Sequence, residues 1–298
     1  MWPLFDLEKQ YATNPQIKRE EIQKLKEWLR TQPHMPELLE HEILLFYRAC
    51  NFQLEYTKQV IDKYFTFRTH AEEFFEDLDV ESPQILQAQQ VMACFPLKGT
   101  TAEGYRVAVS KLLDPDPAKY DFVASFKITF STQDMWLQGQ DLMPGVLIML
   151  DLSGFSLGHF VRIGLPQIKK ILNYLQEAVP SQVIGLHFVN PSAAAEKLMN
   201  LLNQFMKNNM KTALVVHPNL ESLHKHIPRD ILPQEYGGPE ATCAELAEIY
   251  YKQARKYRLD IIEYNNSRRV KEELRPASDR NTVNNFGAQG NFKKIEFD

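Results

Sequence analysis

Three short apolar runs alternate with two longer amphipathic segments in the middle of the chain, and this order constrains the fold more than any other feature. The runs are residues 145–150, 183–189 and 212–216. Continuous apolar runs of this length are typical of strands buried on both faces of a sheet. Residues 159–178 and 193–209, which lie between them, carry apolar side chains at helical spacing. Such alternation builds right-handed crossovers, so it predicts an α/β domain with a mostly parallel sheet.

The N-terminal part of the chain predicts a separate helical domain. Residues 18–29, 37–46 and 56–75 place apolar side chains at helical spacing among charged ones, and prolines lie between the segments. The C-terminal residues are polar, rich in asparagine and basic, so we expect a tail that is mobile or lies over the surface. The expected division is a helical domain at residues 1–83, an α/β domain at residues 84–260 and a polar basic tail at residues 261–298.

Composition excludes several classes of protein. With 34 Lys and Arg against 38 Asp and Glu, the formal net charge is −4, which gives no overall electrostatic footprint for nucleic acid. Cys50, Cys94 and Cys243 are far apart and odd in number, so they indicate neither a metal motif nor a disulfide framework and favour a reducing compartment. No apolar run approaches the ~20 residues of a membrane span, and the acidic N-terminus does not fit a signal peptide. We therefore expect a cytoplasmic monomer.

A search for catalytic and metal-binding motifs gives no strong candidate. The turn after the first apolar run contains two glycines but has neither the G-x-G-x-x-G spacing nor a Lys-Ser or Lys-Thr pair. Asp151 and His187 lie at or beside strand ends, where α/β enzymes place catalytic groups, but we favour a structural hydrogen-bonding role. His224 and His226 would point about 200° apart on a helix, which disfavours a shared metal. We expect no catalysis, metal or cofactor; an enzyme using Asp151 with His187 or His159 is the minor alternative.

Residues 195–207 separate into an apolar and a polar face. At 100° per residue, the apolar side chains fall within an arc of roughly 160°. They are Ala195, Leu198, Met199, Leu201, Leu202, Phe205 and Met206. An ordinary helix facing the core explains this pattern, and so does a lid over a cavity or a helix on a membrane surface. Residues 152–229 contain no Asp and more Lys and Arg than Glu, which fits docking on anionic lipid or a solvated basic face.

Four segments carry a family resemblance. They are LLFYRACNF at residues 44–52, VLIMLDLSGFS at 146–156, GLHFVNPS at 185–192, and the stretch 223–238, which begins LHKHIP and ends ILPQEYGG. The last segment is the most specific, and the matches together span about residues 18–255 in the right order. In these motifs the chain resembles the CRAL-TRIO lipid-binding family, which includes tocopherol and retinaldehyde carriers.

The resemblance implies a helical N-terminal domain followed by a CRAL-TRIO α/β domain, whose mostly parallel sheet floors a lipid cavity under an amphipathic gate helix at residues 193–209. It also implies a helix at residues 120–139, which β-propensity alone would assign partly to strand. The implied activity is non-catalytic. One retinoid, tocopherol, carotenoid or similar isoprenoid is enclosed, carried and released at a membrane surface, including an anionic one. The alternative is a non-catalytic interaction or scaffold module with a filled cavity.

The resemblance further implies the ligand contacts, which fall almost entirely on apolar residues. Carried over by position, they are Ile128, Thr132, Val146, Leu150, Phe155, Leu157, Ile171, Tyr174, Leu175, Val179, Val183, Leu186, Leu198, Leu201, Leu202 and Phe205. Among them, Thr132 and Tyr174 are the polar groups expected to orient a ligand hydroxyl or carbonyl.

The chain departs from the family pattern at two polar sites. The tocopherol carriers have serines at the positions of Ile128 and Thr132, so one hydroxyl is kept here. The family's basic cluster for phosphoinositide headgroups is replaced by Gln182, Ile184, Asn209 and Ala213. Lys207 and Lys211 are the nearby basic residues that we expect to contact a membrane or a phosphoinositide.

Overall fold

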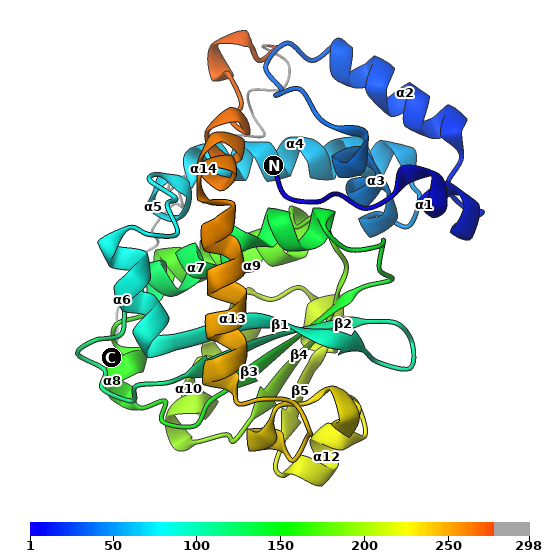
Figure 1. Ribbon diagram of the computed structural model, residues 1–298. Helices are drawn as coiled ribbons and strands as arrows, with labels where there is room; N and C mark the ends of the chain where they lie inside the picture. The colour runs from blue at the N-terminus through cyan, green and yellow to red at the C-terminus, as the bar shows by residue number, and fades with distance from the viewer. Residues whose placement is uncertain (277–298) are drawn as a thin grey trace.

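The computed structural model describes residues 1–276, apart from the side chains of Ala193 and Asn209, and it begins with a helical region (Figure 1). The helices are α1 (Leu7–Thr13), α2 (Arg19–Arg30), α3 (Glu40–Ala49), α4 (Leu54–His70), α5 (Glu72–Phe75) and α6 (Pro83–Val91). The predicted helical domain is confirmed, although the segment expected at residues 56–75 is divided at Ala71 into α4 and α5.

The strands of the described residues form one sheet in the order β1-β2-β3-β4-β5. They are β1 (Met92–Thr100), β2 (Arg106–Leu112), β3 (Val146–Asp151), β4 (Val183–Val189) and β5 (Leu214–His217). β1 pairs with β2 in antiparallel fashion, and the other neighbouring pairs are parallel. The predicted α/β fold with a mostly parallel sheet is therefore confirmed, and β4 has the bounds of the predicted run.

Most of the remaining helices form the crossovers or cover the sheet, whereas α14 and the turn after it lie beside the N-terminal helices (Figure 1). They are α7 (Phe122–Gln138), α8 (Leu157–Phe160), α9 (Leu165–Glu177), α10 (Ala193–Phe205), α11 (Asn208–Lys211), α12 (Leu220–His224), η1 (Arg229–Ile231), η2 (Gln234–Tyr236), α13 (Cys243–Lys256), α14 (Arg258–Ser267) and η3 (Glu272–Leu274). Figure 1 shows α7 and α9 between the N-terminal helices and the sheet. No helix among residues 1–276 is long and apolar enough to cross a membrane.

Helix α7 forms where local β-propensity pointed partly to a strand. The Asp121 carboxylate accepts a hydrogen bond from the backbone N–H of Ala124 at 3.0 Å, which caps the first turn. Further along the helix, Ile128 and Phe130 are buried in a core that also contains residues of α4, α5 and the sheet. Burial of these side chains on several sides stabilises the helix by more than the local β-propensity destabilises it, because tertiary packing supplies most helical stability.

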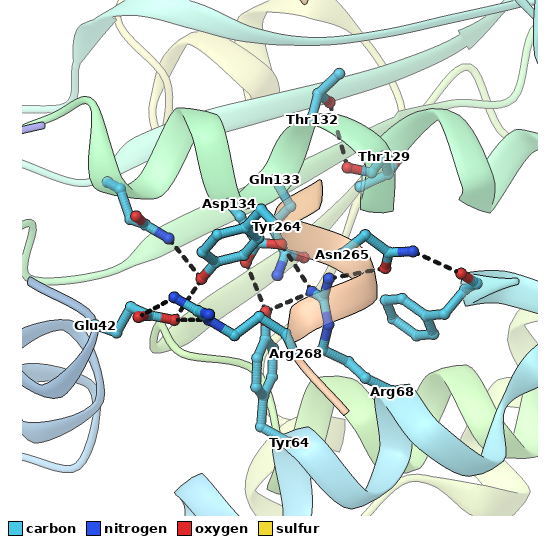
Figure 2. Close-up of polar contacts among 12 residues, drawn as sticks. Glu42, Tyr64, Arg68, Thr129, Thr132, Gln133, Asp134, Tyr264, Asn265 and Arg268 are labelled. Carbon is cyan, nitrogen blue, oxygen red and sulfur yellow. Dashed lines mark hydrogen bonds and ion pairs between the residues drawn. The ribbon is translucent and has the colours of Figure 1, made fainter. Parts of the chain in front are cut away.

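Residues 261–276 are part of the packed body, which differs from the tail expected at residues 261–298. The expected boundary falls inside α14, whose Tyr264 and Asn265 are buried. Figure 2 shows the polar network that attaches this segment: Arg268 donates to both oxygens of Glu42 at 2.9 Å, and Arg68 donates to Asn265 at 3.0 Å. Basic and amide side chains of residues 261–276 thus find buried partners, while residues 277–298 lie outside the described residues.

Candidate ligand-binding cavity

A cavity of about 290 Å³ lies between the sheet and the helices α7, α9, α10 and α13. Its floor includes Ala108 of β2 and Ile148 of β3, and its wall on the side of α13 includes Tyr250. Apolar side chains dominate the lining, so the cavity suits a lipophilic ligand with few polar groups. Its volume does not favour the alternative of a module whose cavity is filled by its own side chains.

Most of the sequence-predicted contact residues lie at this cavity. The lining includes Thr132, Val146, Leu150, Phe155, Ile171, Tyr174, Leu175, Val179, Val183, Leu186, Leu198 and Leu202. Four others lie elsewhere: Ile128 is fully buried in the core, Leu157 is 51% exposed, and Leu201 and Phe205 pack against the core at other positions of α10. Leu198 and Leu202 are one turn apart, so they share the face of α10 that meets the cavity.

Several lining residues were missed by sequence reasoning. The polar ones on α7 are Ser125, Thr129 and Gln133, at i, i+4 and i+8, the spacing of one helical face. Thr129 is exposed although Ile128 and Phe130 beside it are buried, so its accessible surface faces the cavity. Small or uncharged polar residues at this spacing on one face of α7 were a sequence signal for the site.

The strands β1 and β2 contribute a second set of missed residues. The thiol of Cys94 lies 3.5 Å from the hydroxyl of Ser110, and both line the cavity. Burial raises the pKa of the Cys94 thiol, so the group is a neutral part of the wall. β1 contains Pro96 and Gly99, residues that are depleted in strands, and no local pattern marked it as the edge of a site.

Gln133 and Tyr174 form the polar pair of the cavity. The amide Nε2 of Gln133 donates a hydrogen bond to the Tyr174 hydroxyl, and burial raises the pKa of Tyr174, which keeps the phenol protonated. The expected partner, Thr132, instead donates its hydroxyl proton to the carbonyl of Ile128 at 3.1 Å. The groups best placed to orient a ligand are therefore Gln133 and Tyr174.

Asp151, the candidate of the enzyme alternative, is engaged in structural hydrogen bonds. Its carboxylate pairs with Lys111 at 2.7 Å and accepts from the hydroxyls of Ser153 and Tyr236 and the amide of Asn190. Burial alone would raise the pKa of Asp151, but the surrounding hydrogen bonds outweigh it and lower the pKa to about 2. Neither His159 nor His187 is among its hydrogen-bond partners in the described part of the chain, so this arrangement favours the structural role.

Three histidines lie together around β4 and β5. Nδ1 of His187 is 2.8 Å from Nε2 of His217, and the ring centre of His226 is 5.3 Å from each of the other two. Burial and the neighbouring rings lower the pKa of His187 to about 4. Within residues 1–276, no group of three or more His, Cys, Asp or Glu side chains is arranged to hold a metal ion.

Helix α10 covers the cavity and is held at both ends. The Ser192 hydroxyl accepts from the N–H of Ala195 and donates to the carbonyl of Phe155 at 3.2 Å. At the other end, Lys207 forms an ion pair with Glu177 at 2.5 Å. Lys211, the second residue expected at the membrane, is exposed.

A second hollow of about 500 Å³ lies between α6, the loop before α7 and the start of α9. It is wider but open and carries polar side chains such as Gln84, Gln167 and Arg162. Its wall shares Tyr120 and Phe122 with the first cavity. The cavity beneath α10 is the better candidate site because its lining is mainly apolar, and a lipophilic ligand is desolvated favourably only against apolar side chains.

Comparison with known proteins places this architecture in a family. A model described as CRAL/TRIO domain matches residues 90–238, half of the chain, and one described as Pinta-like, UBA domain matches residues 14–85. Clavesin-1 of Xenopus laevis is 26% identical over 231 residues, which are 76% of this chain and 69% of that protein. Alpha-tocopherol transfer protein-like of Homo sapiens is 26% identical over 239 residues, 78% of this chain and 68% of that protein. The crystal structure of Sfh5 aligns with a TM-score of 0.44 and 12% identity, covering 85% of this chain and 98% of that one. From the match over residues 90–238, the chain belongs to the CRAL/TRIO family.

Proposed function

We propose that the protein encloses one small lipophilic molecule and carries it between membranes without converting it chemically. The observation that carries this proposal is the mainly apolar cavity of about 290 Å³ beneath α10. The name of the relative alpha-tocopherol transfer protein-like supports a transfer role. Burial of ~400 Å² of apolar ligand surface at ~25 cal/mol/Å² contributes on the order of 10 kcal/mol before the costs of association.

The polar pair of the cavity narrows the ligand class. With Nε2 of Gln133 donating to Tyr174, the amide oxygen can accept from a ligand and the phenol proton can be donated to it. With the amide turned, the amide nitrogen donates and the phenol oxygen accepts, so the pair always offers one donor and one acceptor. A hydroxyl group matches both functions. We infer an isoprenoid alcohol, and a cavity at the small end of the roughly 300–1,000 Å³ of ligand pockets favours a molecule of retinoid size.

An exposed apolar tip beside the gate supports release at membranes. Leu157, Val161 and Leu165 are 51%, 77% and 43% exposed. They lie at the start of α8, directly after α8 and at the start of α9, and α8 contacts α10. Arg162, between them, is exposed as well. Apolar side chains flanked by a cation suit the interface of an anionic bilayer. We propose that this tip docks on the membrane and thereby places the gate at its surface.

The deciding experiment is extraction of the purified full-length chain with organic solvent and mass spectrometry of the extract, followed by titration with retinol and α-tocopherol. We expect a co-purifying isoprenoid alcohol or sub-micromolar binding of one of the two. If retinoids, tocopherols, carotenoids and phospholipids all bind no better than micromolar, the carrier function is refuted.

A further inference from the structure

Polar contacts tie the C-terminal end of the gate to helix α9. Lys207 lies two residues beyond the end of α10, and its ammonium pairs with Oε1 of Glu177 at 2.5 Å. Its backbone N–H donates to Oε1 of Gln176 at 2.6 Å. The ammonium of Lys169 lies 4.7 Å from the ring centre of Phe205, the last residue of α10. All three partners belong to α9, so this helix fixes the end of the gate.

The same carboxylate also binds the N-terminal helices. Oε2 of Glu177 pairs with Nζ of Lys63 on α4 at 2.5 Å, so one carboxylate holds one ammonium group from each side. Burial alone would raise the pKa of Glu177, but the hydrogen bonds from Lys207 and Lys63 outweigh it and keep the pKa below the ordinary value. At neutral pH the carboxylate is charged while the gate is closed.

We propose that Glu177 is the positioning residue that holds the gate closed, with Lys63 fixing its carboxylate and Lys207 forming the half of the latch that belongs to the gate. The proposal rests on the proposed function of α10 as a gate. In this proposal the ion pair between Glu177 and Lys207 sets the rates at which ligand enters and leaves, whereas the apolar contacts set its affinity.

A latch of this kind has a specific kinetic signature. Because the closed state dominates, weakening the latch raises the small open population and leaves the closed population almost unchanged. A ligand enters and leaves through the open state, so both rates rise by the same factor and Kd stays constant. Because the Lys207 side chain is 58% exposed and the Glu177 side chain 25%, we expect a factor of up to about five.

The chain offers a matched control on the same helix. Lys170 of α9 pairs with Glu73 of α5 at 2.6 Å, and this pair joins α9 to the N-terminal helices without contacting α10. Glu73→Gln therefore removes a comparable ion pair of α9 and leaves the latch intact.

The first test measures amide hydrogen exchange of residues 198–206 in the ligand-free, full-length chain. We expect Glu177→Gln and Lys207→Gln each to accelerate exchange there, by up to about fivefold. The double variant should exchange no faster than Glu177→Gln alone, because Glu177→Gln already removes the ion pair that Lys207→Gln removes. Glu73→Gln should match the wild type. Additive effects of the two latch variants, or equal acceleration by Glu73→Gln, would overturn the proposal.

The second test uses retinol as the probe and follows its stopped-flow transfer to and from neutral phosphatidylcholine vesicles. Glu177→Gln should raise association and dissociation rates equally, whereas a higher Kd at an unchanged association rate would show that Glu177 acts on affinity and not as a latch. If wild-type chain binds no isoprenoid but the exchange pattern holds, the carrier function fails and the latch stands. If retinol binds and the exchange pattern is absent, the latch alone fails.

Discussion

The side-chain amide of Gln133 donates a hydrogen bond to the hydroxyl of Tyr174 in the wall of a mainly apolar cavity. Tyr174 is only 1% exposed, and its ring lies 4.9 Å from that of Phe67 on α4 and 5.2 Å from that of Phe130 on α7. Packing against α4 and α7 thus fixes the position of the Tyr174 ring, and the hydrogen bond to its hydroxyl fixes the orientation of the Gln133 side chain. A pair held in this way can distinguish ligands by their polar end.

The first prediction concerns this pair. Gln133→Leu should weaken retinol binding about tenfold, because the ligand hydroxyl then loses the acceptor for its proton in a desolvated site and keeps only Tyr174. Binding of retinyl methyl ether, which cannot donate, should change much less. Fluorescence titration with both ligands measures the difference, and Thr129→Val, which alters another cavity-lining polar group, is the control. Equal losses for the two ligands in Gln133→Leu would contradict the assignment.

The second prediction concerns the cavity face of the gate. Leu202→Asp should speed the loss of bound retinol at least tenfold, because a carboxylate at the cavity wall is desolvated when the gate closes. The neighbouring Asn203 is exposed, so Asn203→Asp adds the same charge to the same helix without reaching the cavity. Transfer to vesicles reports retention, and far-ultraviolet circular dichroism checks that the helix persists. Unchanged retention in Leu202→Asp would remove α10 from the site.

The third prediction concerns the membrane-docking tip. Val161→Asp should slow transfer to anionic vesicles severalfold, because it places a negative charge where an apolar side chain meets the bilayer. Leu259 on α14 has the same 77% exposure, so Leu259→Asp is a control for added charge alone. Vesicle co-sedimentation and transfer rates measure the effect. If both variants slow transfer equally, the tip has no special role.

The fourth prediction concerns pH. The pKa of His187 is lowered by burial and by His217 and His226 to about 4, while an unfolded histidine titrates near 6.5. The unfolded chain therefore binds an extra proton between those values, so the free energy of unfolding falls as pH drops from ~6.5 to ~4, by about 2 to 3 kcal/mol. Urea unfolding of the wild type and His187→Gln at pH 7 and pH 4.5 tests this.

The variant should lose the part of the pH dependence that His187 contributes. A smaller dependence of the same sign should remain, because burial also lowers the pKa values of His159 and His217. Asp151 does not interfere, because its pKa of about 2 places its own contribution below pH ~4. A wild-type pH profile that His187→Gln leaves unchanged would assign the acid sensitivity to other groups.

The fifth prediction concerns the buried network behind α7. Arg68 pairs with Asp134 at 2.7 Å, with side chains 1% and 10% exposed, and Tyr64 donates to the same carboxylate at 2.6 Å. Asp134→Asn should lower the free energy of unfolding by about 3 to 5 kcal/mol, because it leaves the buried guanidinium without its counter-ion. Lys9 forms an exposed ion pair with Asp141, and Lys9→Gln should cost less than ~1 kcal/mol. If Asp134→Asn and Lys9→Gln lower the free energy of unfolding by similar small amounts, the Arg68–Asp134 pair is accessible to water and the prediction is wrong.

Much of the fold followed from the sequence, because buried parallel strands are continuous apolar runs and amphipathic helices have a clear period. β4 coincides with the predicted run, and β3 and β5 begin within two residues of theirs. The packing of residues 261–276 was not predicted, because their contacts are with residues far away in the sequence. Arg268 reads as a tail residue in sequence, yet its partner Glu42 belongs to α3, and no local pattern reports a contact across that separation.

By itself, the sequence determined the alternation of β3, α9, β4, α10 and β5, the apolar stripe of α10 and the motifs of the CRAL/TRIO family. The tertiary structure decided which part of the stripe meets the cavity, with Leu198 and Leu202 at the wall and Phe205 elsewhere. It also joined Gln133 to Tyr174. The physical reason is that periodicity follows from backbone geometry, which is local, whereas a cavity and its polar partners depend on how separate elements pack together.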